Sequence, residues 1–247
     1  MNKKSNFSII LTLDGYKKEQ INLLENAVES IKTNEGFKDV SIIVADTKKD
    51  TESAVELLEK EFSNVTVVEC NGNDAVNKAA LSCTTKYFTV LRFNDEFTSK
   101  AFSNFEEYGT KNDASVYLSL VKVFSEDEGK ETFLGFANEI AWASSFADEY
   151  GYIKAGELSA YHGFITYGGF FRTEDFISLN GLDLSVEGAE WYEYLSRVIL
   201  SEKRIYVIPK CGYKKNQDVV EYSDEWWKNT FEAKKNIAEK LNLEKNG

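Results

Sequence analysis

The chain has 247 residues, enough to bury a substantial core, and suits one large domain or one domain with a small appendage. Hydrophobic residues at 43% and charged residues at 28% are the balance of a folded globular protein, which argues against long disordered stretches. The formal net charge of −12 argues against sequence-independent nucleic-acid binding, because displacing counterions from phosphates requires many lysines and arginines.

The N-terminal stretch "MNKKSNFSIILTLDGY" superficially resembles a signal peptide, with two lysines before an apolar run. That run, residues 7–13, is short and no small-residue cleavage site follows it, so we interpret it as the first strand. No later stretch approaches the roughly 20 apolar residues that span a bilayer, and no membrane span is expected. Cys70, Cys83 and Cys211 lack C-x-x-C spacing, which predicts neither a disulfide framework nor a zinc site and favours a reducing cytoplasm.

Predicted strands and helices alternate over about the first 95 residues. The strands are apolar runs at residues 7–13, 40–46, 65–70 and 87–93. The helices between them carry apolar residues at helical spacing, at residues 19–33, 51–62 and 74–83. Unbroken apolar strands between helices are typical of a mostly parallel sheet that is covered on both faces, so the sequence predicts an α/β fold.

Polar residues follow the predicted strands, where the carboxyl ends of a parallel sheet form a ligand crevice. Asp14 follows the first strand, and Asp46 ends the second. Arg92, Asn94 and Asp95 lie at the end of the fourth strand, in the stretch "YFTVLRFNDEF". We therefore expect these side chains to meet in one crevice.

The pattern changes after residue 100. A strand is predicted at 115–124, a helix at 189–200 and a last strand at 204–210, which the sole proline, Pro209, is expected to end. A final helix is predicted from an N-cap at Ser223 to about Leu241. The Gly-rich and aromatic sequence between 133 and 172 follows neither pattern clearly.

The order of these motifs resembles the family 2 glycosyltransferases, whose fold is called GT-A. "SIILTLDGY" stands where that family has its opening strand, and "SIIVADTKKDT" is similar to its second strand, which ends in a base-binding aspartate, here Asp46. "NDAVNKAALSCTTKYFTVLRFNDEF" resembles an Arg-Asn-x-Gly helix followed by the metal-binding Asp-x-Asp strand. Asn77 fits that helix, while Val76 replaces its arginine.

Two later segments extend the resemblance over roughly residues 6–210. "YGGFFRTEDFISLNGLD" is similar to the family's Gly-Gly-Phe-Asp segment, and "AEWYEYLSRVILSEKRIYVIP" is similar to its Glu-Asp helix and the following strand. The resemblance implies a GT-A domain at residues 1–215, with a mostly parallel Rossmann-like sheet flanked by helices. Residues 216–247 would form a C-terminal helical extension.

The blocks "WASSFADEYGYI", "GGFFRTEDFISLNGLD" and "RIYVIPKCGYKK" also resemble a divergent branch of these proteins encoded by tailed bacteriophages. This resemblance implies a place in the host cytoplasm or in the virion. It also raises the possibility of a structural role for the chain.

The resemblance implies a nucleotide-sugar donor and a divalent cation, Mn²⁺ or Mg²⁺, that the Asp-x-Asp carboxylates hold. Here Arg92 occupies the position of the first aspartate, Asn94 occupies that of the second, and Asp95 follows. The fixed positive charge of Arg92 should repel a metal ion. Three alternatives stay open. Arg92 clamps the diphosphate directly, it pairs with Asp46 or Asp95 in a site that no longer turns over, or Asp95 and Glu96 hold a metal in another arrangement.

Sugar transfer with inversion needs a general base, and the resemblance places it in a Glu-Asp pair that reads Glu190-Trp191 here. Glu190 is the candidate base, and Glu193 lies one helical turn further on. Acidic residues near a helix N-terminus also stabilise the helix dipole. His162, the only histidine, is expected to be a hydrogen-bonded structural residue.

Two hypotheses follow. The first is a nucleotide-sugar-dependent glycosyltransferase with Glu190 as base and a set of donor-binding residues, namely Asp14, Asp46, Asn77, Arg92, Asn94 and Asp95. The second is a non-catalytic GT-A-fold subunit, a pseudoenzyme, in a larger protein assembly such as a bacteriophage particle. Trp226 and Trp227, with Phe231 and Leu241, are expected to dock the final helix on the body or on a protein partner.

Overall fold

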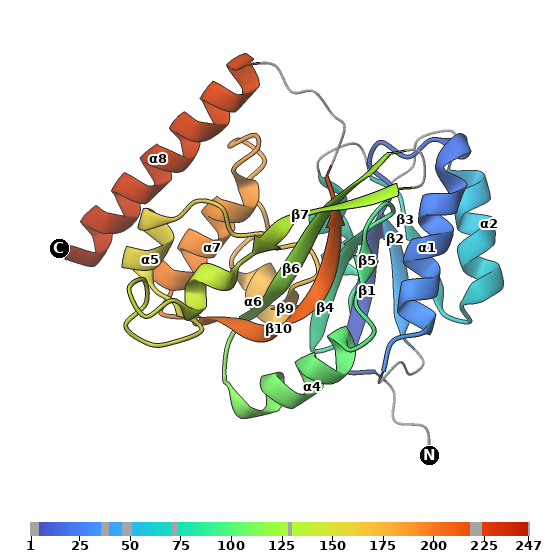
Figure 1. The fold of residues 1–247 in the computed structure, drawn as a ribbon, viewed down its shortest axis with the longest axis horizontal. Coiled ribbons are helices and arrows are strands. Elements are labelled where there is room, and N and C mark those ends of the chain that lie inside the picture. Colours follow the sequence, from blue (N-terminus) through green and yellow to red (C-terminus); the bar gives the residue numbers. More distant parts are fainter. Residues whose placement is uncertain are drawn as a thin grey trace.

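The computed structural model describes residues 5–35, 40–45, 51–70, 74–127, 130–217 and 224–246. Within these ranges ten strands form one sheet in the order β3-β2-β1-β4-β9-β6-β10-β5, with β7 paired to β6 and β8 to β10 (Figure 1). The strands are β1 (Phe7–Thr12), β2 (Ser41–Ala45), β3 (Val65–Val68), β4 (Tyr87–Arg92), β5 (Glu96–Phe97), β6 (Val116–Asp127), β7 (Lys130–Ala137), β8 (Tyr152–Ile153), β9 (Phe170–Arg172) and β10 (Ile205–Asn216).

Eight α-helices lie in the described ranges. They are α1 (Ile21–Lys32), α2 (Glu52–Glu61), α3 (Ala75–Leu81), α4 (Ala101–Lys111), α5 (Ala155–Ala160), α6 (Thr173–Ser178), α7 (Glu190–Leu200) and α8 (Asp224–Asn246). Short 3-10 helices span Lys18–Gln20 and Glu139–Trp142.

The N-terminal half is the parallel β/α arrangement that the sequence predicts. Strands β3, β2, β1 and β4 pair in parallel, and β1 is buried along its whole length. Ile9 and Leu11 point into a core that α1, α2 and α4 cover, whereas Ile10 points into a second core beneath α3, α6 and α7. Helices on both faces explain why these strands read as unbroken apolar runs.

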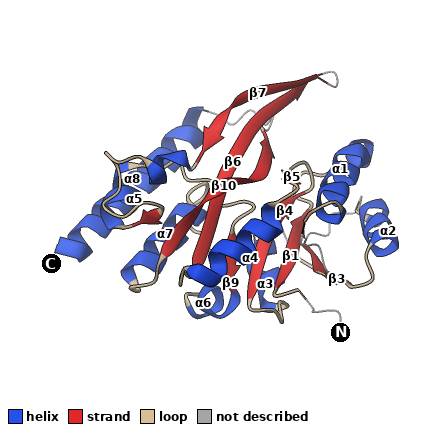
Figure 2. Ribbon diagram, turned by 60° about the horizontal axis from the view of Figure 1, so that its bottom comes forward, coloured by secondary structure: helices blue, strands red, loops and turns tan. Residues whose placement is uncertain are grey.

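The C-terminal half mixes strand directions. Strand β9 lies antiparallel between β4 and β6, and β10 runs parallel to β6. Strands β6 and β7 form a long hairpin that reaches beyond the body of the molecule (Figure 2).

Strand β10 corrects one prediction, because Pro209 does not end it. The strand continues to Asn216, with register shifts between Ile208 and Cys211 and between Cys211 and Tyr213. Proline lacks an N–H to donate to the ladder, and an irregularity in the pairing accommodates that loss. The strand therefore carries residues 211–216 up to the carboxyl end of the sheet.

The final helix packs through its C-terminal half. Ala238 and Leu241 are buried in the core that also contains α7, as expected for Leu241. Trp227 and Phe231 are 58% and 62% exposed, and the Phe231 ring lies 6.4 Å from that of His162. Ser223 lies outside the described residues, as does the side chain of Trp226. No helix in the described ranges is long and apolar enough to cross a membrane.

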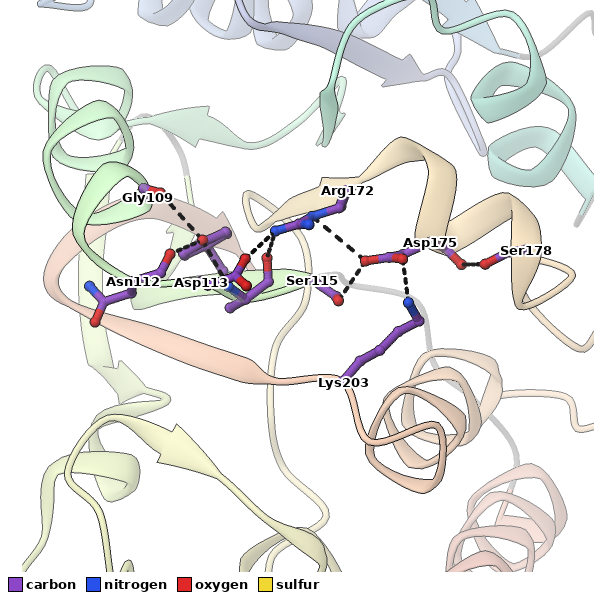
Figure 3. Close-up of polar contacts among 10 residues, drawn as sticks. Gly109, Asn112, Asp113, Ser115, Arg172, Asp175, Ser178 and Lys203 are labelled. Carbon is purple, nitrogen blue, oxygen red and sulfur yellow. Dashed lines mark hydrogen bonds and ion pairs between the residues drawn. The ribbon is translucent and has the colours of Figure 1, made fainter.

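An ionic cluster fixes α6 to the end of the sheet opposite the predicted crevice (Figure 3). Asp175, 7% exposed, accepts hydrogen bonds from Lys203 Nζ at 2.5 Å and Ser115 Oγ at 2.6 Å. Arg172 Nε lies 3.6 Å from the same carboxylate, and its Nη2 donates to Asp113 at 2.6 Å. The cluster joins β6, β9, α6 and the residues that precede β10.

We predict that Asp175→Asn lowers the free energy of unfolding by about 1–2 kcal/mol, because it leaves the half-buried Lys203 and Arg172 without a charged acceptor. Asp113→Asn is the matched control, since Asp113 pairs with the same arginine but its side chain is 89% exposed. Asp113→Asn should lower the free energy of unfolding by no more than about 0.5 kcal/mol. Urea unfolding at neutral pH measures both, and equal losses would contradict the assignment.

The same cluster sets a pH dependence. Burial alone would raise the pKa of Asp175, but hydrogen bonds from Lys203 and Ser115 hold it below its ordinary value. The stabilisation is therefore complete above the unfolded-state pKa, about 3.9. It is lost as the pH falls through the lower native pKa, and Asp175→Asn should remove this acid-side loss.

Candidate functional site

The candidate site lies where β1 and β4 end side by side. Thr12 and Arg92 are register partners at the carboxyl ends of these strands. The chain then turns, with the N–H of Asp95 donating to the carbonyl of Arg92 at 3.1 Å, and enters β5. Strand β5 pairs with the far end of β10, so β10 lies beside the turn that follows β4.

Asp95 is completely buried in this turn. Its Oδ1 accepts a hydrogen bond from the N–H of Asn216 at 2.7 Å, and its Oδ2 accepts one from Tyr213 Oη at 3.0 Å. Burial raises the pKa of Asp95 to about 6, although Arg92, Asn216, Lys215 and Tyr213 each oppose the shift. The carboxylate therefore fastens the turn after β4 to the end of β10.

These contacts do not fit a resident metal ion at Asp95. Both of its oxygens accept protein hydrogen bonds, and Arg92 Nε lies 4.0 Å from Oδ2. Glu96, the other carboxylate considered for a metal, pairs with Lys214 at 3.1 Å. Across the described ranges, no group of three or more His, Cys, Asp or Glu is arranged to hold an ion.

Arg92 sits at the rim of the crevice, with its side chain 18% exposed. Its guanidinium lies over the ring of Tyr167 at 5.5 Å, and its main-chain N–H donates to Tyr213 Oη at 3.2 Å. The pairing of Arg92 with Asp95 is at the outer limit of an ion pair. Asp46, the other proposed partner, lies outside the described residues.

Asn77 connects α3 to the segment after α6. Its amide donates to the carbonyl of Leu182 at 2.9 Å and accepts from the N–H of Leu182 at 2.7 Å. Gly181 has φ +63°, and a Cβ there would lie 2.4 Å from Asn77 Oδ1, so a larger residue would break the contact. Both polar atoms of the Asn77 side chain are therefore used to hold the loop at Leu182 against α3.

Two further predicted residues lie around the crevice. Asp14 is exposed just after β1, and Asn94 is half-buried in the turn between β4 and β5. Burial raises the pKa of Tyr167, the charges of Asp95 and Asp14 raise it further, and Arg92 lowers it. Of these groups, the Arg92 guanidinium lies over the Tyr167 ring.

The candidate base lies at the start of α7, directly before a residue that packs on Tyr167. Trp191, the second residue of α7, packs against Tyr167 with ring centroids 6.1 Å apart. Glu190, the first residue of α7, is half-buried. On the side of α8, its charge acts on Lys234, whose pKa is lowered by burial. Contacts thus lead from Arg92 through Tyr167 to Trp191, and Glu190 precedes Trp191 in the sequence.

Two alternatives considered from the sequence have structural roles. Glu193 accepts hydrogen bonds from Arg197 at 2.6 to 2.8 Å, and Arg197 also donates to the carbonyls of Leu179 and Gly181. His162 Nε2 lies 3.1 Å from the carbonyl of Ser159, and its ring packs on Tyr192. His162 is a hydrogen-bonded structural residue, as predicted.

Sequence reasoning missed the partners of Asp95. Tyr213 and Asn216 belong to the part of β10 that was expected to lie beyond the strand. The tyrosine and two lysines of "CGYKKN" continue the strand pattern after Pro209 and offer the available signal. Tyr167 and Trp191 were seen only as parts of longer motifs.

Comparison of the whole structure decides the fold. No protein-family model matches the sequence, and no curated protein matches it. The crystal structure of S. aureus TarS 1-349 in complex with UDP superposes with a TM-score of 0.64 at 13% identity, covering 95% of this chain and 69% of that chain. TarS is a family 2 glycosyltransferase.

The chain has a GT-A fold. The UDP-GlcNAc complex of TarS 1-349 gives a TM-score of 0.63 at 13% identity, covering 90% of this chain and 64% of that one. The crystal structure of S. aureus TarS gives a TM-score of 0.60 at 15% identity, covering 85% of this chain and 36% of that chain. This chain therefore superposes on part of TarS 1-349 and spans only a portion of TarS.

We predict that Asp95 makes the GT-A domain more stable as the pH falls from neutral toward 4. Its native pKa, about 6, exceeds the unfolded value of about 3.9, so the native state binds more protons between these values and the free energy of unfolding rises by up to about 3 kcal/mol. Asp95→Asn should remove this rise in pH-dependent urea unfolding. Parallel profiles for both proteins would contradict the burial argument.

Proposed function

We propose that the protein is a glycosyltransferase that takes a sugar from a nucleotide-sugar donor. The observation that carries the proposal is the superposition on TarS over 95% of this chain, since TarS has been crystallised with UDP and with UDP-GlcNAc. In an open α/β sheet a ligand binds outside the carboxyl ends of the strands, where the crevice of Arg92 and Tyr167 lies. A uridine nucleotide is the first donor to test.

The donor would lie across the ends of β1, β2 and β4. Asp14, Asp46 and Asn94 are the candidates for contacts to the nucleoside, and Arg92 is the candidate for the diphosphate. Asn77 supports this site indirectly, because it holds the loop at Leu182 through two hydrogen bonds. Asp95 also supports the site indirectly, because its hydrogen bond from Tyr213 holds the turn after β4 against β10.

Glu190 is the candidate general base. In the proposed step an acceptor hydroxyl gives its proton to the Glu190 carboxylate while its oxygen forms a bond to the anomeric carbon. The bond from that carbon to the donor phosphate breaks, and its electron pair stays on the nucleoside diphosphate. Such a base contributes about 10²- to 10⁴-fold to a rate.

Glu190→Gln should therefore lower sugar transfer at least about 100-fold while leaving UDP binding unchanged, because the amide cannot accept the proton. Glu187→Gln is the control, since Glu187 is an exposed neighbour in the preceding turn. Release of UDP from UDP-sugars, with oligosaccharide acceptors, measures the rate, and calorimetry measures binding. Equal rates for Glu190→Gln and wild type would exclude Glu190 as the base.

A non-catalytic interaction subunit is the second candidate, and a separate observation favours it. Strand β7 carries three large apolar side chains, Phe133, Leu134 and Phe136, that are 52%, 48% and 50% exposed. Exposed apolar side chains on such a strand are typical of protein interfaces. A bacteriophage particle, which the sequence resemblance implies, is one assembly that would use them.

Calorimetry with UDP- and GDP-sugars, with and without Mn²⁺, separates the two candidates. The glycosyltransferase proposal expects binding, and no heat at millimolar donor would leave the interaction subunit as the supported function. Finding the protein in stoichiometric copies in a purified particle would support the second candidate directly.

A further inference from the structure

Strand β10 carries a second cation near Asp95, Lys215, that the sequence motifs did not single out. Lys215 follows Tyr213 by two residues on β10, within a stretch of the β6 pairing that has no register shift. Alternate residues of a strand share a face, so Lys215 points to the same side of the sheet as Tyr213. Tyr213 Oη contacts Asp95, which sets Lys215 beside the turn after β4.

Two independent contacts agree with this placement. The pairing of β5 with β10 joins Tyr213 to Phe97 and Lys214 to Glu96, so the same register continued by one residue sets Lys215 opposite Asp95. The N–H of Asn216, the next residue, donates to Asp95 Oδ1 at 2.7 Å. The charge of Lys215 also acts on the Asp95 carboxylate, together with that of Arg92.

The adjacent lysine lies on the opposite face of β10. Lys214 Nζ pairs with Glu96 at 3.1 Å and with Glu131 at 3.3 Å. Two neighbouring residues with the same side chain therefore differ in what they face. Lys214 belongs to an ion cluster with Glu96 and Glu131, and Lys215 lies on the face of Tyr213.

We propose that Arg92 and Lys215 flank Asp95 and together bind the donor diphosphate in place of a divalent cation. This inference rests on the proposed function, and it names how that site recognises its substrate. A nucleoside diphosphate leaves with growing negative charge, which cationic donors fixed by the protein can stabilise. Asp95 contributes by holding the turn and β10 together, since both of its oxygens already accept protein hydrogen bonds.

Calorimetry of the full chain in EDTA tests the proposal, with UDP and inorganic pyrophosphate as probes. We expect wild type to bind both without metal, and Lys215→Gln to weaken both about tenfold, the loss of one charge-assisted contact. Lys214→Gln should bind like wild type. Lys215→Arg should stay within about threefold, because it keeps the charge.

The outcomes separate this inference from the proposed function. UDP binding that needs Mn²⁺, or that Lys215→Gln leaves unchanged, overturns the cation pair and keeps the glycosyltransferase proposal. Pyrophosphate binding that depends on Lys215, without UDP binding, supports the cation pair and overturns the nucleotide-sugar assignment. If Lys214→Gln and Lys215→Gln weaken binding equally, the effect comes from the overall charge of the protein. That result would overturn the proposed pairing of Arg92 and Lys215. A thermal unfolding midpoint for each variant identifies any that fail to fold.

Discussion

The arrangement of the crevice depends on how the carboxylate of Asp95 is satisfied once it leaves water. A buried charge is costly unless hydrogen bonds and opposite charges surround it. Tyr213 and the N–H of Asn216 supply those hydrogen bonds from β10, and Arg92 supplies a positive charge from the turn itself. Because the donors lie on β10 and the carboxylate lies in the turn after β4, satisfying Asp95 also joins these two distant segments.

This constraint changes what a degenerate Asp-x-Asp motif means. A carboxylate that binds a metal must present its oxygens to the ion, whereas Asp95 presents them to the protein. The side chain that reaches the rim instead is a guanidinium resting on Tyr167. On the proposed function, this guanidinium would meet an anionic ligand, and Trp191, which follows Glu190 in α7, packs against Tyr167.

The two candidate functions use different parts of one scaffold. The crevice lies at the carboxyl ends of the parallel strands, while the exposed apolar side chains lie on β7, in a hairpin that reaches away from the body (Figure 2). A GT-A fold can host either function, since function resides in the site and the surface rather than in the fold. Sugar transfer and assembly into a larger particle are therefore compatible in one chain.

The sequence by itself determined the parallel half of the sheet, because unbroken apolar strands and amphipathic helices are local patterns, and it set Arg92 and Asp95 at a strand end. It left the short strands β5, β8 and β9 unassigned, and it ended β10 too early at Pro209. The partners of Asp95 lie 118 and 121 residues away, and no local period connects residues so distant. Only the tertiary structure could decide that Asp95 turns inward, because hydrogen bonds across the sheet, rather than the motif, determine where its oxygens point.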